Sequence, residues 1–300
     1  MTTIAIQPPQ PGLLLPALLL AGLLGVIGTQ TGILQLPFPA DPAIRPVTVT
    51  IAPRTFTYRA PGDFLHGNAT VDGPLLSVDT TAPLEIMKYQ VSAADYAECV
   101  REAACRKAEP RRRGEGDVPV TGVSFDDANR YAIWLSDKTG ETWRLPTVEE
   151  WTFAAGSKAR DHALGVDTDA ADPAERWLAY YERDSALEAA APAMPEPLGT
   201  FGENEYGVAD LTGPVWEWTA TCGSRTTLGD AGEIASHLQS CGVRLLEGRH
   251  RTPMSSFVRD AQGGGCSVGA PPDNLGFRLV RERPRWGALL DGAARLFRIG

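Results

Sequence analysis

Short apolar runs separated by turn residues recur along this chain and predict a set of brief β-strands. They form one group before residue 92 and a second group after residue 242, with amphipathic helices between the two groups. Within each run the apolar positions are continuous or alternate. The predicted strands cover residues 47–51, 64–67, 75–78, 84–91, 243–246, 254–258 and 275–280.

Three helices are predicted after residue 91, each by a polar cap in front of helically spaced apolar residues. Ser92, Ser124 and Thr147 are suitable N-cap residues, and Gly140 and Gly156 end the second and third helices. The acidic residues at the third helical position are Asp95, Asp127 and Glu150. We interpret these carboxylates as caps that stabilise helix N-termini rather than as catalytic groups.

The first 36 residues differ from the rest of the chain because they are almost entirely apolar. No charged side chain occurs between Thr2 and Ala40, and the run is long enough to cross about 30 Å of hydrocarbon as a helix. A cleaved signal peptide is the alternative, but such peptides have a basic N-terminal region and a shorter apolar run. We therefore expect one transmembrane helix that remains as an uncleaved anchor.

The remaining sequence predicts a single α+β domain with much irregular structure. We expect a linker over residues 37–60, the domain over 61–283 and an amphipathic tail over 284–300. The net charge of −9 argues against a nucleic-acid partner, because nucleic-acid-binding proteins normally present a basic face.

Five cysteines indicate the compartment in which the domain folds. Their spacing gives no paired C-x-x-C zinc pattern. Cys99 and Cys105 flank the end of a predicted helix, so we expect a disulfide between them. A second bridge is expected among Cys222, Cys241 and Cys266, and Cys222 and Cys241 bracket a polar segment. Disulfides are typical of an exported domain, whereas reduced thiols in an intracellular protein are the alternative.

Four sequence blocks resemble the sulfatase-modifying-factor family, whose founding activity is formylglycine generation. They are EIMKYQVSAADYAECV at residues 85–100, PVTGVSFDDANRYAIWL at 119–135 with WRLPTVEEWTFAAG at 143–156, LGTFGENEYGVADLTGPVWEWT at 198–219, and NLGFRLVRE at 274–282. The resemblance implies a domain with a variant C-type-lectin-like topology and little regular secondary structure.

The resemblance also implies two metal sites, and this sequence departs from the family at both. A closely spaced cysteine pair binds copper in the formylglycine-generating members, but the matching residues 244–260 contain no cysteine. We therefore expect no copper cofactor, since thiolates select Cu(I). In the calcium-binding loop of the family, Pro214 replaces an asparagine, which leaves Glu217 as the candidate calcium ligand. A buried Glu217 hydrogen-bonded to backbone amides is the alternative.

Near the missing cysteines, the family has a groove that holds a peptide in extended form. The resemblance places Trp216 and Trp218 beneath this groove. The residues expected to line it are Arg249, His250, Arg251, Ser255, Ser256 and Arg259. Several cations on one wall suit an acidic or carboxylate-bearing ligand, unless two of the arginines are paired within the protein.

Together these features favour a binding protein over an enzyme. We expect an inner-membrane, single-pass protein whose domain in the periplasm serves as an accessory factor for maturation or assembly of a partner protein. Overall resemblance suggests copper nitrite reductase of denitrification as that partner. The alternatives are a formylglycine-generating-type oxidase, another oxygen-dependent protein-modifying enzyme, or a structural subunit of a membrane complex.

Overall fold

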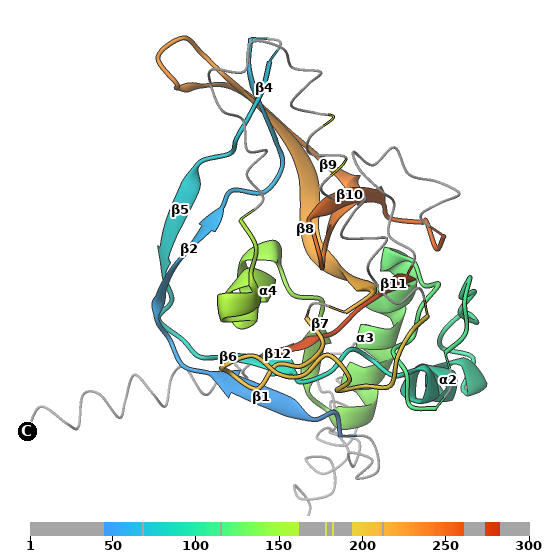
Figure 1. Ribbon diagram of the computed structural model, residues 1–300. Coiled ribbons are helices and arrows are strands. Elements are labelled where there is room, and N and C mark those ends of the chain that lie inside the picture. Colours follow the sequence, from blue (N-terminus) through green and yellow to red (C-terminus); the bar gives the residue numbers. More distant parts are fainter. Residues whose placement is uncertain are drawn as a thin grey trace, which may run out of the picture. The chain divides into compact units, whose positions relative to one another are not determined.

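The computed structural model describes residues 45–67, 69–114, 116–161, 178, 182, 194–211, 213–260 and 274–282, all within the compact unit Ala43–Gly300 (Figure 1). The predicted anchor, the predicted tail and Cys266 lie outside these residues. In the part of the chain that is described, no helix is both long enough and apolar enough to span a bilayer.

A four-stranded sheet forms the base of the domain, with its strands in the order β1-β6-β12-β7. Its strands are β1 (Thr48–Ile51), β6 (Leu84–Met87), β12 (Val280–Glu282) and β7 (Thr142–Arg144). All neighbouring strands run antiparallel. This sheet therefore joins the first strand of the domain to the last.

The boundary predicted at residue 61 is placed too late. Both β1 and β2 (Thr55–Arg59) precede it, and β2 pairs with β5 (Leu75–Asp79) in a two-stranded sheet. Ile51 of β1 is buried in a core cluster with Ile86, Trp151 and Phe153, so this stretch belongs to the core rather than to a linker.

The second large sheet is organised around a long hairpin, which is coloured orange in Figure 1. Its strands are β8 (Val215–Leu228), β9 (Ile234–Glu247), β10 (Thr252–Ser255), β3 (Asp63–His66), β4 (Ala69–Val71) and β11 (Asn274–Gly276). The order is β10-β9-β8-β3-β4, and β11 adds to the start of β8 in parallel.

The hairpin also includes residues 223–240, the polar segment between Cys222 and Cys241 in which the sequence predicted no strand. They continue the antiparallel ladder of β8 and β9, although every residue from Ile234 to Gly242 is exposed. Because neither face of this part of β9 is buried, its sequence lacks the alternation that reveals a half-buried strand.

The three predicted helices are confirmed as α2 (Ala93–Arg101), α3 (Phe125–Thr139) and α4 (Val148–Ala155). Ser124 with Asp127, and Thr147 with Glu150, form complete capping boxes. Gly140 ends α3 in the left-handed conformation with φ of 69°. The first turn of each helix is thus fixed by its own side chains, as the spacing predicts.

The last predicted strand, residues 275–280, is instead divided into β11 and β12. Phe277 and Leu279 are fully buried between these strands, and so is Arg278. The Phe277 ring packs edge-on against Tyr131 of α3, with 5.5 Å between the ring centroids. The strand is interrupted because Arg278 turns inward to a polar partner in the core.

We predict that Gly122→Ala destabilises the domain much more than Gly140→Ala. Both glycines have positive φ, 72° and 69°, so both substitutions carry the backbone penalty of about 1–2 kcal/mol. A Cβ at Gly122 also lies 2.2 Å from the backbone carbonyl of Glu109, whereas a Cβ at Gly140 has no atom within 4 Å. This overpacking adds about 1–3 kcal/mol to the loss. Equal losses of unfolding free energy in urea would contradict the assigned contact.

Candidate functional site

Glu217, near the start of β8, and Arg278, between β11 and β12, form a fully buried ion pair. Arg278 Nε lies 2.6 Å from Glu217 Oε2, and Arg278 Nη2 lies 2.7 Å from Oε1. The two side chains are 1% and 0% exposed. This is a bidentate pair from which water is excluded, so its geometry is strongly constrained.

Every remaining polar atom of the pair also has a partner. Gln90 Nε2 donates to Glu217 Oε1, and Trp151 Nε1 donates to Oε2, each over 2.8 Å. Arg278 donates its other N–H groups to the backbone carbonyls of Met87, Lys88 and Ala209. The pair therefore connects β6, β8, α4 and the loop that precedes β8.

These contacts do not suit Glu217 for calcium. To bind calcium, Glu217 would have to offer a carboxylate oxygen to the ion, but each of its two oxygens already accepts two N–H groups. The backbone amides proposed as alternative donors are also incorrect, because all four donor atoms belong to side chains. In addition, the Pro214 carbonyl accepts a hydrogen bond from Asn274 Nδ2.

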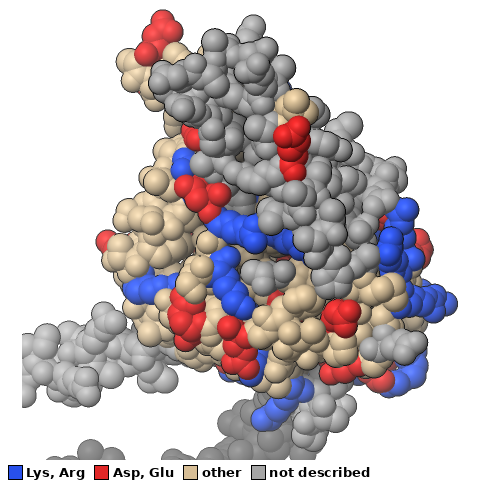
Figure 2. Space-filling model, viewed as in Figure 1, with Lys and Arg blue, Asp and Glu red and all other residues tan. Residues whose placement is uncertain are grey.

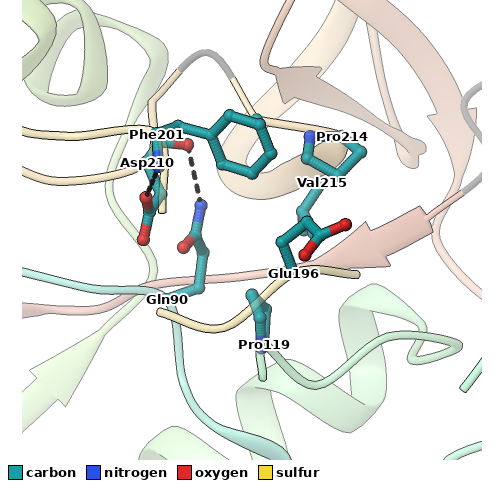
Figure 3. A pocket seen from close by; sticks show the side chains of 8 residues that line it. Gln90, Pro119, Glu196, Phe201, Asp210, Pro214 and Val215 are labelled. Carbon is teal, nitrogen blue, oxygen red and sulfur yellow. Dashed lines mark hydrogen bonds between the residues drawn. The ribbon is translucent and has the colours of Figure 1, made fainter. Parts of the chain in front are cut away.

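A small hollow lies beside the ion pair, with Pro214 in its wall (Figure 3). Its lining residues are Gln90, Pro119, Glu196, Phe201, Asp210, Gly213, Pro214 and Val215. The Asp210 carboxylate accepts the backbone N–H groups of Gly199 and Phe201 at 2.6 and 2.9 Å. Asp210 thus fixes the shape of its own loop, and the hollow contains none of the predicted groove residues.

Arg249 and His250 are buried and do not line an open groove. Trp216 Nε1 donates to the His250 carbonyl over 3.0 Å, and the two rings meet edge-on. The Arg249 guanidinium lies 5.4 Å from the centroid of the Trp216 ring. Both side chains therefore pack the turn between β9 and β10 onto the tryptophan core.

Arg251 and Arg259 are paired inside the protein, as the alternative interpretation holds. Arg251 Nε lies 2.6 Å from Glu247 Oε1, and its Nη1 donates to the Arg59 carbonyl. Arg259 binds both oxygens of Asp127 and also reaches Glu109. Basic and acidic side chains also lie next to one another on the face shown in Figure 2. The expected cationic wall is therefore largely neutralised.

Asp127 connects the Arg259 segment to the start of α3. Its carboxylate is buried, caps the helix together with Ser124, and forms ion pairs with Arg106 and Arg259. Burial raises the pKa of this carboxyl, but the hydrogen bonds from Arg259 and Ser124 outweigh burial and hold the pKa below its usual range.

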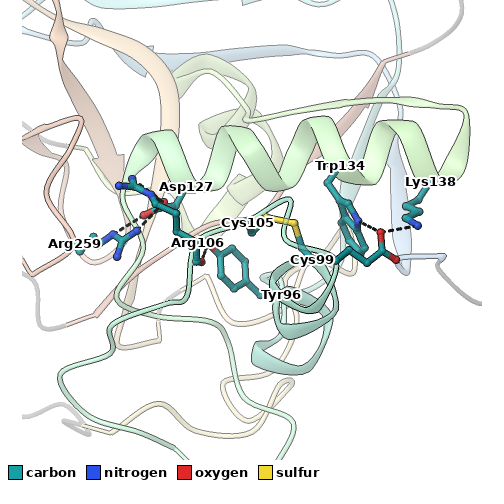
Figure 4. Close-up of a disulfide and its surroundings, with 9 residues drawn as sticks. Tyr96, Cys99, Cys105, Arg106, Asp127, Trp134, Lys138 and Arg259 are labelled. Carbon is teal, nitrogen blue, oxygen red and sulfur yellow. Dashed lines mark hydrogen bonds and ion pairs between the residues drawn. A yellow bond between two sulfur atoms is a disulfide. The ribbon is translucent and has the colours of Figure 1, made fainter.

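Both disulfides that we expected are present. Cys99–Cys105 closes the end of α2 under α3, and Cys222–Cys241 joins the two strands of the hairpin. Figure 4 shows the first disulfide lying between the Asp127 cluster and the side chains of Trp134 and Lys138 on α3. Both of these side chains contact Glu102 at the end of α2. Cys222 and Cys241 are therefore the pair in the second bridge.

Phe257 is an accessible residue that sequence reasoning missed. Its side chain is 73% exposed, and Ser255 and Ser256 before it are half-buried. The Ser256 amide donates a hydrogen bond to the Gly242 carbonyl, and the Ser256 carbonyl accepts one from the Phe125 amide. Phe257 lies in the turn that follows β10, so no alternation of apolar positions in the sequence indicated its exposure.

Comparison with known proteins gives a consistent result. The family model described as "Sulfatase-modifying factor enzyme 1-like domain" matches residues 40–283. The chain is 30% identical over 175 residues to a Mus musculus protein named "Inactive C-alpha-formylglycine-generating enzyme 2", with 56% of this chain and 51% of that protein covered. It is 29% identical over 196 residues to the formylglycine-generating enzyme of Streptomyces coelicolor, covering 61% and 60% of the two chains.

The chain thus spans little more than half the length of these curated relatives. The solved structure of PvdO from Pseudomonas aeruginosa is similar over 83% of this chain and 100% of that chain, with a TM-score of 0.53 and 20% identity. This likeness supports the fold. It carries no information about the activity of this chain.

We predict that Arg278→Met strongly destabilises the domain, whereas Arg281→Met has a small effect. Removing Arg278 leaves the buried Glu217 carboxylate without its cation, which costs about 3–5 kcal/mol. Arg281 pairs with Glu85 and Glu141 near the surface, where such pairs contribute up to about 1 kcal/mol. Free energies of unfolding in urea test this, and the double variant Glu217→Leu with Arg278→Met should recover part of the loss. If Arg278→Met and Arg281→Met lowered the free energy of unfolding by similar amounts, the role of the buried pair would be contradicted.

We also predict that Asp127→Asn weakens the acid sensitivity of the domain. Since the folded pKa of Asp127 lies below its ordinary value of 3.8, its stabilisation is present above that pH and is lost as the pH falls through the folded pKa. The unfolding free energy of the variant should fall less steeply with acidification than that of the wild type. Asp126→Asn, at the exposed neighbouring position, is the control. An unchanged slope in Asp127→Asn would be inconsistent with this assignment.

Proposed function

The chain belongs to the sulfatase-modifying factor enzyme 1-like family, and we propose that it acts within this family by binding rather than by oxidation. Its role is that of an accessory factor that recognises an extended peptide segment of a partner protein. The observation that carries this proposal is the chemistry of residues 244–260, which correspond to the copper-binding segment of the formylglycine-generating members.

The donor set of this segment does not fit copper. Residues 244–260 contain no cysteine, and the potential ligand His250 is packed edge-on against Trp216. Imidazole can bind copper, but Cu(I) sites of this kind need soft thiolates. A binding function also agrees with the name of the mouse relative, which describes that protein as inactive.

The same segment suits recognition because it is held rigidly. Arg251 is fixed to Glu247 and Arg259 to Asp127, so little conformational freedom remains to be lost on binding. Between these anchors, Pro253 and Phe257 are exposed, and Ser255 and Ser256 are half-buried. An exposed aromatic ring flanked by hydroxyl groups fits an apolar side chain and the backbone of an extended peptide.

The setting that we propose is the outer face of the inner membrane. The apolar first 36 residues support a single-pass anchor, and the two disulfides support a periplasmic domain. Maturation or assembly of a periplasmic enzyme fits this setting. Copper nitrite reductase is proposed as the partner on overall resemblance.

Peptide binding is tested first. The purified chain is presented to a displayed library of random short peptides, and we expect enrichment of a set that Phe257→Ala no longer retains. Ile133→Ala is the matched control, because Ile133 is similarly exposed but lies on α3. The loss should correspond to at least about tenfold weaker binding, as expected when a central aromatic anchor is removed.

The oxidase alternative is tested with the same protein preparation. The chain is supplied with Cu(I), oxygen and a cysteine-containing peptide, and we expect neither stoichiometric copper nor an aldehyde product. Formation of the aldehyde would overturn the binding-only function. Peptides retained equally by Phe257→Ala would show that the binding surface lies elsewhere.

A further inference from the structure

The two disulfides differ in their exposure to solvent. Cys99 is 0% exposed and Cys105 is 7% exposed, so the first bridge is enclosed by the core. Cys241 is exposed to solvent, and Cys222 is half-buried. An attacking group can therefore approach Cys241 directly, whereas it cannot reach the first bridge without opening the domain.

A cation lies against one sulfur of the exposed bridge. Arg244 stands opposite Cys222 in the β8–β9 ladder, and its Nη1 lies 3.1 Å from Cys222 Sγ. The guanidinium is held in place by the Ala220 carbonyl at 2.6 Å and by the Phe125 ring at 4.2 Å. Burial lowers the pKa of Arg244, and the charge of nearby Asp126 on α3 opposes this effect. Arginine remains a cation under such shifts.

From this arrangement we infer that Cys222–Cys241 is a thiol–disulfide exchange site whose substrate is a cysteine thiolate on an extended peptide. The incoming thiolate attacks Cys241 Sγ, and the Cys222–Cys241 bond breaks. A mixed disulfide forms at Cys241, and Cys222 leaves as a thiolate beside Arg244. A second substrate thiolate then attacks the substrate sulfur of the mixed disulfide, and Cys241 leaves as a thiolate. The two substrate thiols are thereby oxidised to a disulfide, and the protein disulfide is reduced to the thiols of Cys222 and Cys241.

The direction of attack follows from the asymmetry of the two sulfurs. Exchange is faster when the leaving sulfur forms a more stable thiolate, and a neighbouring cation stabilises a thiolate. Arg244 provides this stabilisation to Cys222. Solvent exposure makes Cys241 the sulfur that is attacked.

The fold tolerates opening of this bridge because the hairpin has other connections on both sides of it. Gly223 pairs with Ser240 toward the tip, and Trp218 pairs with Leu246 toward the core. The ladder is irregular at Cys222, so the bridge occupies a bulge. Breaking the disulfide therefore leaves the backbone pairing of β8 and β9 in place.

The exchange site also adjoins the accessible segment before Arg259. Gly242 follows Cys241, and its carbonyl accepts the Ser256 amide over 2.9 Å. A peptide bound at Ser255–Phe257 would thus lie near Cys241. The exchange chemistry itself requires no peptide-binding surface, so it can be tested, and can fail, independently of the proposed function.

Glutathione is the probe in the first experiment, and the full chain carries Cys266→Ser so that this cysteine cannot exchange. After limited reaction and alkylation, mass spectrometry identifies which cysteines have opened. We expect Cys222–Cys241 to open at least about tenfold faster than Cys99–Cys105, with glutathione attached to Cys241. Equal opening rates, or glutathione mainly on Cys222, would overturn the assignment.

The role of Arg244 is tested by Arg244→Gln. Arg225→Gln is the control, because Arg225 is an exposed cation on β8, the strand that carries Cys222. We expect Arg244→Gln to slow opening by about tenfold, and Arg225→Gln to leave it unchanged. Circular dichroism establishes that both variants are folded. Equal rates in the two variants would remove Arg244 from the site.

A second measurement does not depend on the disulfide. In Cys241→Ser, the pH dependence of Cys222 alkylation should give a thiol pKa below the ordinary value of about 8.5. Adding Arg244→Gln should raise it. A pKa that does not change between these variants would contradict stabilisation of the Cys222 thiolate by Arg244.

Discussion

Burial of the Glu217 carboxylate is the constraint on which the rest of this domain depends. A charge without water must have every oxygen paired, and here the donors come from the β11–β12 connection, from α4 and from the segment after β6. Arg278 in turn donates to carbonyls of that same segment after β6 and of the loop that precedes β8. Since each donor fixes the segment that carries it, one carboxylate sets the relative positions of segments that are far apart in sequence. Little regular secondary structure is needed once these segments are fixed.

In the candidate groove, too, charged side chains pair with groups of the protein itself. Its cations were expected to meet a ligand, but Arg251 and Arg259 already have carboxylates, and Arg249 lies over a tryptophan. What remains accessible is small and mostly uncharged. The domain thus presents hydroxyl groups, an aromatic ring and an exposed disulfide on a framework whose charges are neutralised from within. Such a surface favours contact with peptide backbone and apolar side chains over electrostatic attraction.

Local signals predicted the helices well, because Ser124 with Asp127 and Thr147 with Glu150 act within one helical turn. The pairing of Cys99 with Cys105 was similarly local. Long-range partners were harder to predict. Nothing in the spacing of Arg278 or Gln90 indicates that they meet Glu217, and the exposed half of β9 has no apolar alternation to reveal a strand. Sequence resemblance identified the loop around Glu217, but it could not show that an arginine, rather than a metal ion or backbone amides, would satisfy the carboxylate.

The exposed half of the β8–β9 hairpin has a practical consequence for engineering. Side chains from Ile234 to Gly242 pack against no core, and the Cys222–Cys241 bridge separates this half from the buried tryptophans. The turn at residues 229–233 lies beyond the last ladder pairs and is mostly exposed. Exposed hairpin tips of this kind accept inserted sequence with little effect on folding. An epitope or fluorescent reporter placed in this turn would follow the protein in cells while leaving the Glu217 centre undisturbed.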